Sequence, residues 1–118
     1  MDRYNWQGIP LEKLSDQLSR QVVHTAQSTI ARITLKKGAV VPMHRHVNEQ
    51  VTMLRSGALQ FDLEGERFVL RAGDVLVIPP EAPHEVLALE DSEAQDSFTP
   101  PREDWIRGDD TYLRKASK

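Results

Sequence analysis

Alternation of apolar and polar residues with a period of two, interrupted by turns at short intervals, is the feature that most constrains this chain. Segments 31–35 and 59–63 alternate in this way, which places their apolar side chains on one face of a strand. Further strands are predicted at 50–55, 67–70, 75–78, 84–89 and 95–98. Turn residues recur roughly every 8–12 positions and no long amphipathic helix is evident, so the pattern favours an all-β antiparallel sandwich or barrel.

The length of 118 residues predicts a single domain over 1–118. We expect the barrel to occupy about residues 18–98, with a tail over 99–118 that forms a covering loop or a short helix. Before the barrel, Pro10 to Leu14 is predicted to form one helical turn, because proline is favoured at an early helical position.

Composition excludes several classes of function. The formal net charge of −3 gives no basic excess for nucleic acid or for an anionic membrane. Cysteine is absent, which excludes disulfides, thiolate metal ligands and thiol nucleophiles, so the four histidines must carry any transition-metal chemistry. The first residues resemble no signal peptide and no apolar run is long enough for a membrane helix. We therefore expect a cytoplasmic protein.

The densest group of chemically active residues is His44-Arg45-His46, followed by Gln50 and, later, His84. Residues at i and i+2 of a strand point to the same side, so His44 and His46 lie side by side, and by the same parity Gln50 joins them. Three imidazoles and one amide oxygen would form a neutral ligand set, which suits Lewis-acid polarisation of oxygen by a divalent metal.

Two alternatives remain open for this cluster. An H-x-H pair by itself is more often an ordinary pair of surface histidines than a metal site. Glu49 is the rival of Gln50 as the fourth ligand, and a bulge or turn at Asn48 would bring it inward.

The spacing around these histidines matches two motifs of a known family. Residues 38–57 match G-x5-H-x-H-x3,4-E-x6-G with Gln50 at the Glu position, and residues 73–88 match G-x5-P-x-G-x2-H-x3-N at Gly73, Pro79 and His84. In the second motif Glu81 replaces Gly and Ala88 replaces Asn. The chain thus resembles small single-domain cupins. The resemblance implies an RmlC-like double-stranded β-helix, or jelly-roll barrel, that binds a metal at His44, His46, Gln50 and His84 and that is frequently paired into dimers.

The end of the last strand supplies a second group of candidates. Asp96 and Phe98 share one face of the strand, and a carboxylate facing the barrel interior would have a raised pKa that suits proton exchange. After Pro100-Pro101, the planar fork of Arg102 could reach back to bind a substrate carboxylate. The alternative is an Asp96–Arg102 salt bridge that only holds the tail.

A closer resemblance favours the first of these interpretations. The combination H-x-H-x2-E-Q, P-P-x2-P-H and D-x-F-x-P-P-R-E-D is similar to the KdgF family of pectin-degradation cupins, over about Trp6 to Trp105. It implies that Asp96, Phe98 and Arg102 line a pocket beside the metal. Asp96 and Arg102 would be catalytic, and Phe98 and Arg102 would bind substrate. The implied reaction is metal-dependent ring opening of 4,5-unsaturated uronate sugars.

Three other functions stay open at this point. They are an iron-dependent cupin dioxygenase, a non-catalytic small-molecule binding cupin and a polyketide-cyclase-like cupin. The ligand types suit Zn, Ni, Fe, Co or Mn alike. Apolar Val51 and Met53 lie on the face opposite Gln50, where a homodimer contact or ordinary sheet packing would explain them. His24 is predicted to be a surface histidine or one that faces a dimer partner.

Overall fold

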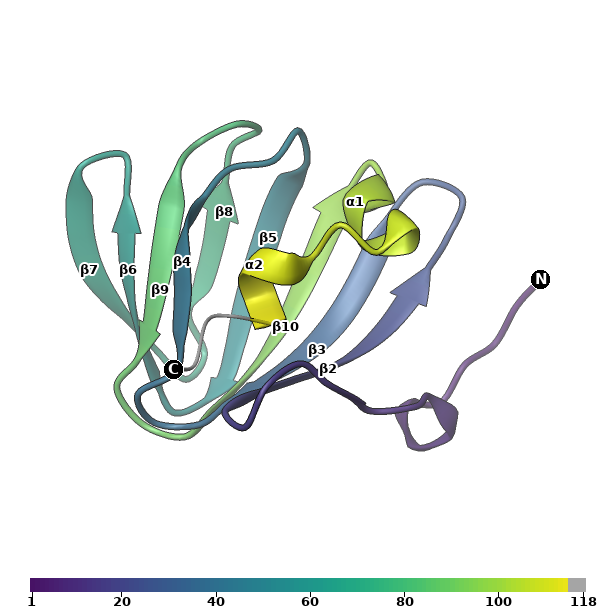
Figure 1. Ribbon diagram of the computed structural model, residues 1–118, viewed down its shortest axis with the longest axis horizontal. Helices are drawn as coiled ribbons and strands as arrows, with labels where there is room; N and C mark the ends of the chain where they lie inside the picture. The colour runs from purple at the N-terminus through teal and green to yellow at the C-terminus, as the bar shows by residue number, and fades with distance from the viewer. Residues whose placement is uncertain (115–118) are drawn as a thin grey trace.

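Two antiparallel sheets face each other and enclose one apolar core in the computed structural model, which describes residues 1–114 (Figure 1). The larger sheet has the order β1-β2-β3-β10-β5-β8, with bounds Glu12–Lys13, Leu18–His24, Thr29–Leu35, Ser92–Thr99, Glu49–Ser56 and Val75–Ile78. The smaller sheet has the order β4-β9-β6-β7, with bounds Val40–His44, His84–Ala88, Ala58–Leu63 and Glu66–Arg71. The predicted all-β jelly-roll barrel is therefore confirmed.

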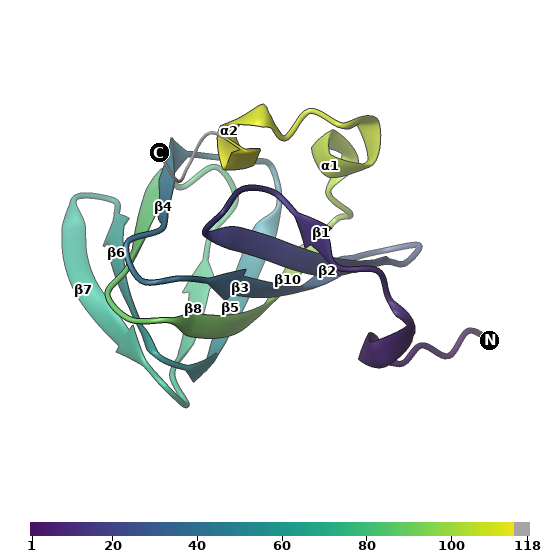
Figure 2. The same ribbon diagram turned by 60° about the horizontal axis from the view of Figure 1, so that its bottom comes forward.

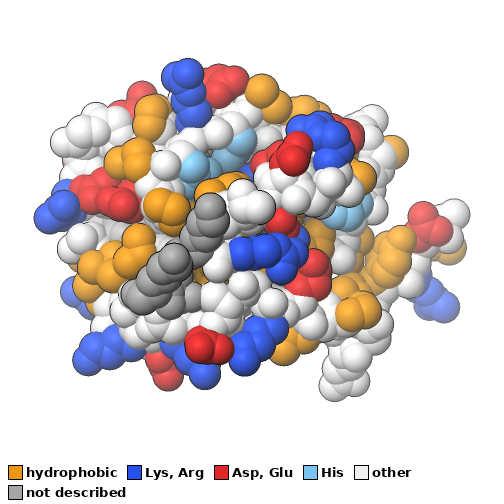
Figure 3. Space-filling view, viewed as in Figure 1, with side chains coloured by type: hydrophobic (Ala, Val, Ile, Leu, Met, Phe, Trp, Pro, Cys, Tyr) orange, Lys and Arg blue, Asp and Glu red, His pale blue; other side chains and the backbone are white. Residues whose placement is uncertain are grey.

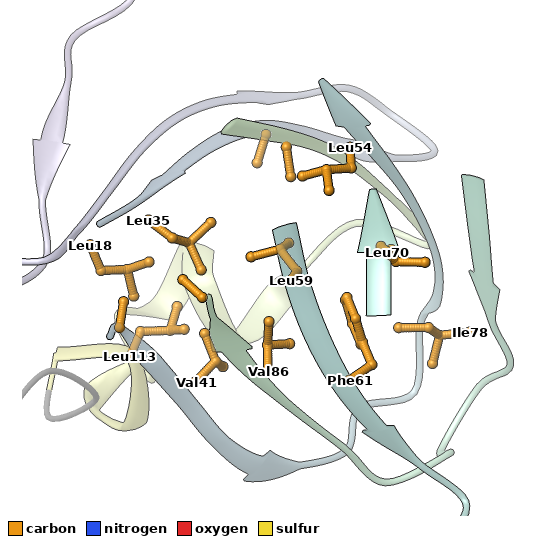
Figure 4. Packing of buried hydrophobic residues seen from close by; sticks show 14 of the residues in the cluster. Leu18, Leu35, Val41, Leu54, Leu59, Phe61, Leu70, Ile78, Val86 and Leu113 are labelled. Atoms are coloured by element: carbon orange, nitrogen blue, oxygen red, sulfur yellow. The ribbon is translucent and has the colours of Figure 1, made fainter. Parts of the chain in front are cut away.

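The core follows from the period-two pattern that the sequence displays. Alternate residues of each strand point between the sheets, where Phe61, Leu59 and Leu54 are at most 2% exposed (Figure 4). Each fully buried side chain of this size contributes about 1.5–3 kcal/mol relative to exposure. The inner faces of β5 and β10 change character along their length, from the pair Leu54 and Ala94 to the pair Thr52 and Asp96, with Gln50 beyond them. This change places the polar residues of the barrel interior at one end.

Two short helices, α1 (Glu103–Arg107) and α2 (Thr111–Arg114), follow β10. Figures 1 and 2 show both on the same side of the molecule, near β4 and β10. The tail was expected to form a covering loop or short helix, and this is what residues 99–114 form; residues 115–118 of the predicted tail lie outside the described residues. Within the described residues, no helix is long and apolar enough to cross a membrane.

The segment before the barrel differs from expectation. The predicted helical turn at Pro10–Leu14 is wrong, because Glu12–Lys13 forms β1 and pairs with β2. The only helical turn before the barrel is a 3-10 turn at Trp6–Gly8, capped by the side chain of Asn5. Strand β2 was not predicted within the barrel because Arg20 and Gln21 interrupt its apolar pattern.

Gly57, in the turn between β5 and β6, is required by its surroundings. Its φ is +89°, and an added Cβ would collide with the side chain of Ser92 and the carbonyl oxygen of Asp91. Gly65 also has a positive φ, +82°, but nothing lies within 4 Å of the position of its Cβ. A comparison of substitutions at these two positions therefore distinguishes the cost of backbone strain from the cost of steric collision.

We expect Gly57→Ala to lower the free energy of unfolding by about 3 kcal/mol or more, since strain and overpacking add. Gly65→Ala should cost about 1 kcal/mol, from backbone strain alone. Urea unfolding followed by circular dichroism measures both. Equal losses in the two variants would show that the close approach of Ser92 and Asp91 has no effect on stability.

Candidate metal centre

Three histidines meet at the polar end of the barrel. His44 ends β4 and His84 begins β9, and the two residues are directly paired in the register of these strands. His46 lies just beyond β4, in the loop that leads to β5. One ligand nitrogen from each histidine lies within 4.8 Å of the others. His44 and His46 are partly exposed, whereas His84 is 1% exposed, and Figure 3 shows pale blue histidine atoms at the surface on this side of the molecule.

Backbone carbonyl groups fix which nitrogen of each ring carries the proton. Nδ1 lies 2.8 Å from the carbonyl oxygen of Pro42 in His44, 3.1 Å from that of Asn48 in His46, and 2.8 Å from that of Ala82 in His84. A carbonyl oxygen only accepts, so each Nδ1 must donate. Each neutral ring then presents the unprotonated Nε2 as a lone pair, which is the arrangement that metal-binding histidines use.

The rings are also held in the neutral form. Burial and the nearby His84 lower the pKa of His44 to about 3. Burial and the positive charge of Arg102 lower the pKa of His46 to about 4, and burial lowers the pKa of His84 as well. No proton therefore competes for the three Nε2 lone pairs at neutral pH.

Gln50 completes the cluster, whereas Glu49 points away from it. The Gln50 side chain is 6% exposed, and its Nε2 donates to Thr52 Oγ1 over 2.9 Å. This bond orients the amide so that Oε1 lies 3.1 Å from Nε2 of His46. Glu49 is exposed, so the bulge that would bring it inward does not form. The structure brings Gln50 together with His44 and His46 as predicted, but residues 45–48 form a loop, so strand parity is not what aligns the three side chains.

These residues fit a metal ion. With Nδ1 of His46 protonated, Nε2 of His46 and Oε1 of Gln50 are two lone pairs that face each other without a hydrogen between them. Nε2 of His84 is buried and has no hydrogen-bond partner within residues 1–114. Buried polar atoms are rarely left without a partner, and a cation bound at this point would satisfy all of them.

Asp96 and Phe98 lie beside the histidines, and both line the same cavity as His44 and His84. Asp96 is only partly accessible, and its Oδ1 is enclosed without a hydrogen-bond partner within residues 1–114. Burial raises the pKa of Asp96 to about 6, although a hydrogen bond from Thr52 and the charge of Arg102 act in the opposite direction. The ring of Phe98 packs edge-on against His46 at 5.7 Å.

Arg102 also lines this cavity and is 1% exposed. Its Nε and Nη2 donate to the two carboxylate oxygens of Asp104, over 2.9 and 2.7 Å. Burial would raise the pKa of Asp104, but these paired hydrogen bonds outweigh burial and hold it below its usual value. The predicted alternative, a salt bridge between Asp96 and Arg102, does not form. Asp104 therefore already accepts from two donors of the guanidinium group that was expected to bind a substrate carboxylate.

The tail contributes residues that sequence reasoning missed. The hydroxyl of Tyr112 accepts a 2.7 Å hydrogen bond from Nη2 of Arg102, and its ring lies 4.8 Å from that of His44. Trp105 is 8% exposed, with the guanidinium of Arg102 4.3 Å from its ring centroid, a favourable cation–π distance. No spacing in the sequence relates Tyr112 to the histidines.

Asn48 and Glu81 hold the loops that carry the candidate ligands. Asn48 is 2% exposed and donates through Nδ2 to the carbonyl oxygens of Pro100 and Pro101, which ties the His46 loop to the tail. Glu81 has a φ of +64° and donates its backbone N–H to the carbonyl oxygen of His46 over 2.8 Å. The position where the motif has glycine therefore keeps the backbone conformation of glycine, at a cost in strain.

The remaining histidine lies away from this centre. His24 ends β2, is exposed, and bonds through Nδ1 to Thr29 Oγ1 over 2.8 Å. It is a surface histidine, as predicted.

Comparison with known proteins agrees with this geometry. A family model described as "Cupin domain" matches residues 31–95. The pectin degradation protein KdgF of Dickeya dadantii (strain 3937) is 27% identical over 100 residues, which cover 82% of this chain and 91% of that protein.

Two solved structures are similar along most of their length. The structure of KdgF from Halomonas sp. has a TM-score of 0.82 and 29% identity, covering 89% of this chain and 98% of that one. An RmlC-like cupin from Shewanella frigidimarina has a TM-score of 0.82 and 26% identity, covering 89% and 96%.

We expect His84→Ala to weaken metal binding by more than about 100-fold, because loss of an outer-shell partner alone costs about 10–100-fold. His24→Ala is the matched control and should bind metal as the wild type does. Metal content after dialysis, measured by plasma mass spectrometry, compares the three proteins. Full metal content in the folded His84→Ala variant would contradict this ligand assignment.

Variants at the neighbouring residues Glu49 and Gln50 test which of the two is the fourth metal ligand. Gln50→Ala should weaken metal binding, since it removes the oxygen that faces His46, whereas Glu49→Ala should leave affinity unchanged. Competition with a chromogenic chelator measures both affinities. The reverse order would identify Glu49 as the ligand.

Proposed function

Because the chain belongs to the cupin domain family, we propose that it is a metal-dependent enzyme that opens the ring of 4,5-unsaturated uronate monosaccharides. The observation that carries the proposal is the enclosed carboxylate of Asp96 in the cavity that His44 and His84 also line. The likeness to relatives named for pectin degradation supports the substrate class.

In this proposal His44, His46, Gln50 and His84 hold one divalent metal ion. When bound, such an ion supplies Lewis-acid polarisation of substrate oxygens. All four ligands are neutral, so the ion keeps about its full charge for that task. The ligand types do not discriminate among Zn, Ni, Fe, Co and Mn.

The proton chemistry is assigned to Asp96. As a carboxylate it takes the proton of the anomeric hydroxyl, the bond between the anomeric carbon and the ring oxygen breaks, and an aldehyde forms at that carbon. The ring oxygen leaves as an enolate, and the carboxylic acid of Asp96 returns the proton to the enol carbon C4. The product is a linear keto aldehyde with the same atoms and electrons as the substrate. A pKa near 6 lets one group act as base and then as acid at neutral pH.

Arg102 and Phe98 are assigned to substrate binding. The Nε and Nη2 atoms of Arg102 are engaged by Asp104, so we assign Nη1 to the substrate carboxylate. Phe98 is 2% exposed and offers an apolar wall for the sugar ring. The charge of Arg102 would also favour the anionic substrate over a neutral sugar.

The tail takes part in substrate access. The cavity encloses about 60 Å³, whereas pockets for small molecules usually measure ~300–1,000 Å³. A monosaccharide therefore requires residues of the tail, such as Trp105 and Tyr112, to shift outward on binding. The hydrogen bonds of Asn48 to Pro100 and Pro101 would keep the start of the tail in place during this movement.

Turnover of a 4,5-unsaturated galacturonate by metal-replete protein tests the function, followed as loss of the ultraviolet absorbance of the unsaturated uronate. We expect Asp96→Asn to lower kcat by about 10²–10⁴-fold, as is typical for loss of a general acid–base group, with metal content unchanged. Asp62 lies on β6 and does not line this cavity. The Asp62→Asn variant is therefore the control and should retain wild-type kcat.

The outcomes separate the competing functions. A wild type no faster than the spontaneous reaction would refute uronate ring opening, and oxygen consumption by the Fe(II) form would then favour a dioxygenase. Equal kcat in wild type and Asp96→Asn would refute the proton role of Asp96 alone.

A further inference from the structure

The guanidinium of Arg102 has two edges on which a carboxylate can accept a pair of hydrogen bonds. Asp104 occupies the edge formed by Nε and Nη2. The other edge is formed by the second hydrogen of Nη2 and the adjacent hydrogen of Nη1. The hydroxyl of Tyr112 accepts from Nη2 over 2.7 Å, and it accepts this second hydrogen because the first points to Asp104. Tyr112 therefore occupies one half of an edge that fits a carboxylate.

The ring of Tyr112 extends from this edge to the candidate metal centre. Its centroid lies 4.8 Å from that of His44, and both residues line the same cavity as Arg102. A ligand that reaches from Arg102 to the histidines therefore needs the space that this ring fills. A uronate monosaccharide is such a ligand, since it joins a carboxylate to a six-membered ring. Tyr112 joins a single oxygen to a six-membered ring and lies where that sugar would bind.

We infer that Tyr112 is a specificity-determining residue whose hydroxyl occupies the position of one substrate carboxylate oxygen and is displaced by it. The inference rests on the proposed function, and it identifies the contact that is exchanged when the substrate enters. The two carboxylate oxygens bind Nη1 and Nη2 of Arg102 as the Tyr112 side chain turns outward. A carboxylate replaces a neutral acceptor by a charged one and adds a bond to Nη1, whereas the hydroxyl of a neutral sugar replaces one neutral acceptor by another.

The surroundings of Tyr112 allow its side chain to move while α2 stays in place. Asp110 and Leu113 are 2% and 7% exposed, and Asp110 accepts a hydrogen bond from the buried guanidinium of Arg20, so both residues anchor α2 to the barrel. Tyr112 is only partly buried. Nε1 of Trp105 also donates to its hydroxyl, but over 3.5 Å, which is longer than a usual hydrogen bond. Displacement therefore breaks one short hydrogen bond, and the incoming carboxylate restores it.

Binding of D-galacturonate to the metal-replete protein, measured by titration calorimetry, tests this exchange. The saturated sugar carries the carboxylate but lacks the double bond of the proposed substrate, so binding is observed without turnover. Tyr112→Phe removes only the hydroxyl. We expect it to lower the Kd for galacturonate by about 10-fold or more, because a hydrogen bond to a charged group no longer has to be broken. The only other tyrosine, Tyr4, is 63% exposed and does not line this cavity, so Tyr4→Phe is the matched control and should bind as the wild type does.

The sign of the change decides between the possible roles of the hydroxyl. Weaker or unchanged binding by the folded Tyr112→Phe variant would overturn the inference, as would the absence of binding by both proteins. The assay does not depend on the reaction. The expected gain in a protein that fails to open unsaturated uronates would refute the proposed function and support the exchange at Arg102, whereas ring opening without this gain would refute the exchange alone.

Fluorine NMR follows the displacement itself, because the chain has only two tyrosines. Protein labelled with 3-fluorotyrosine should give separate signals for Tyr4 and Tyr112, and the Tyr112→Phe variant assigns them. Saturating D-galacturonate should move the Tyr112 signal toward its position in the unfolded protein, whereas D-galactose at the same concentration should leave it in place. Bound galacturonate with an unchanged Tyr112 signal would show that the hydroxyl stays on Arg102 and would overturn the inference.

Discussion

Three neutral imidazoles held with their lone pairs facing one another are the constraint around which this end of the barrel is built. Such an arrangement is unfavourable without a cation, so the protein has to prevent the rings from turning away. It does so with three backbone carbonyl groups that fix Nδ1 of each ring. Two of them, those of Pro42 and Ala82, belong to residues two positions before His44 and His84, which pair directly across β4 and β9. Strand pairing therefore sets the positions of these two rings, and the carbonyl groups of Pro42 and Ala82 set their tautomers.

The tail solves a second problem, which is how to bury a guanidinium beside this cluster. Arg102 lowers the pKa of the histidines, yet a lone buried charge would be costly. Asp104 neutralises it with paired hydrogen bonds, and Tyr112 and Trp105 provide an acceptor and an aromatic face. A second pair, Arg20 with Asp110, anchors the tail to the inner side of β2. The tail therefore closes the cavity with charges that are already paired, so its movement need not expose an isolated ion.

The sequence could predict the barrel and the grouping of the site residues because both depend on local alternation. Parity places Asp96 with Phe98 on β10, and the same rule applied to β5 would have placed Thr52 beside Gln50, the residue that it orients. The loop at 45–48 interrupts the strand, so the family motif rather than parity relates Gln50 to the histidines. The partners of Arg102 could not be found in this way. Asp104 and Tyr112 bind it through the path of the tail, which no periodic pattern encodes. Glu81 shows a further limit, because a backbone conformation typical of glycine persists there without glycine.

Strands β5 and β10 present one face to the candidate site and the other to the outside of the barrel. Thr52 and Asp96 are paired on the inner face, and the next pair along the same strands, Val51 and Ser97, lies on the outer face. A shift of one residue in their pairing would exchange these faces, so the register that places Thr52 and Asp96 inside the barrel also decides which side chains of β5 and β10 face outward.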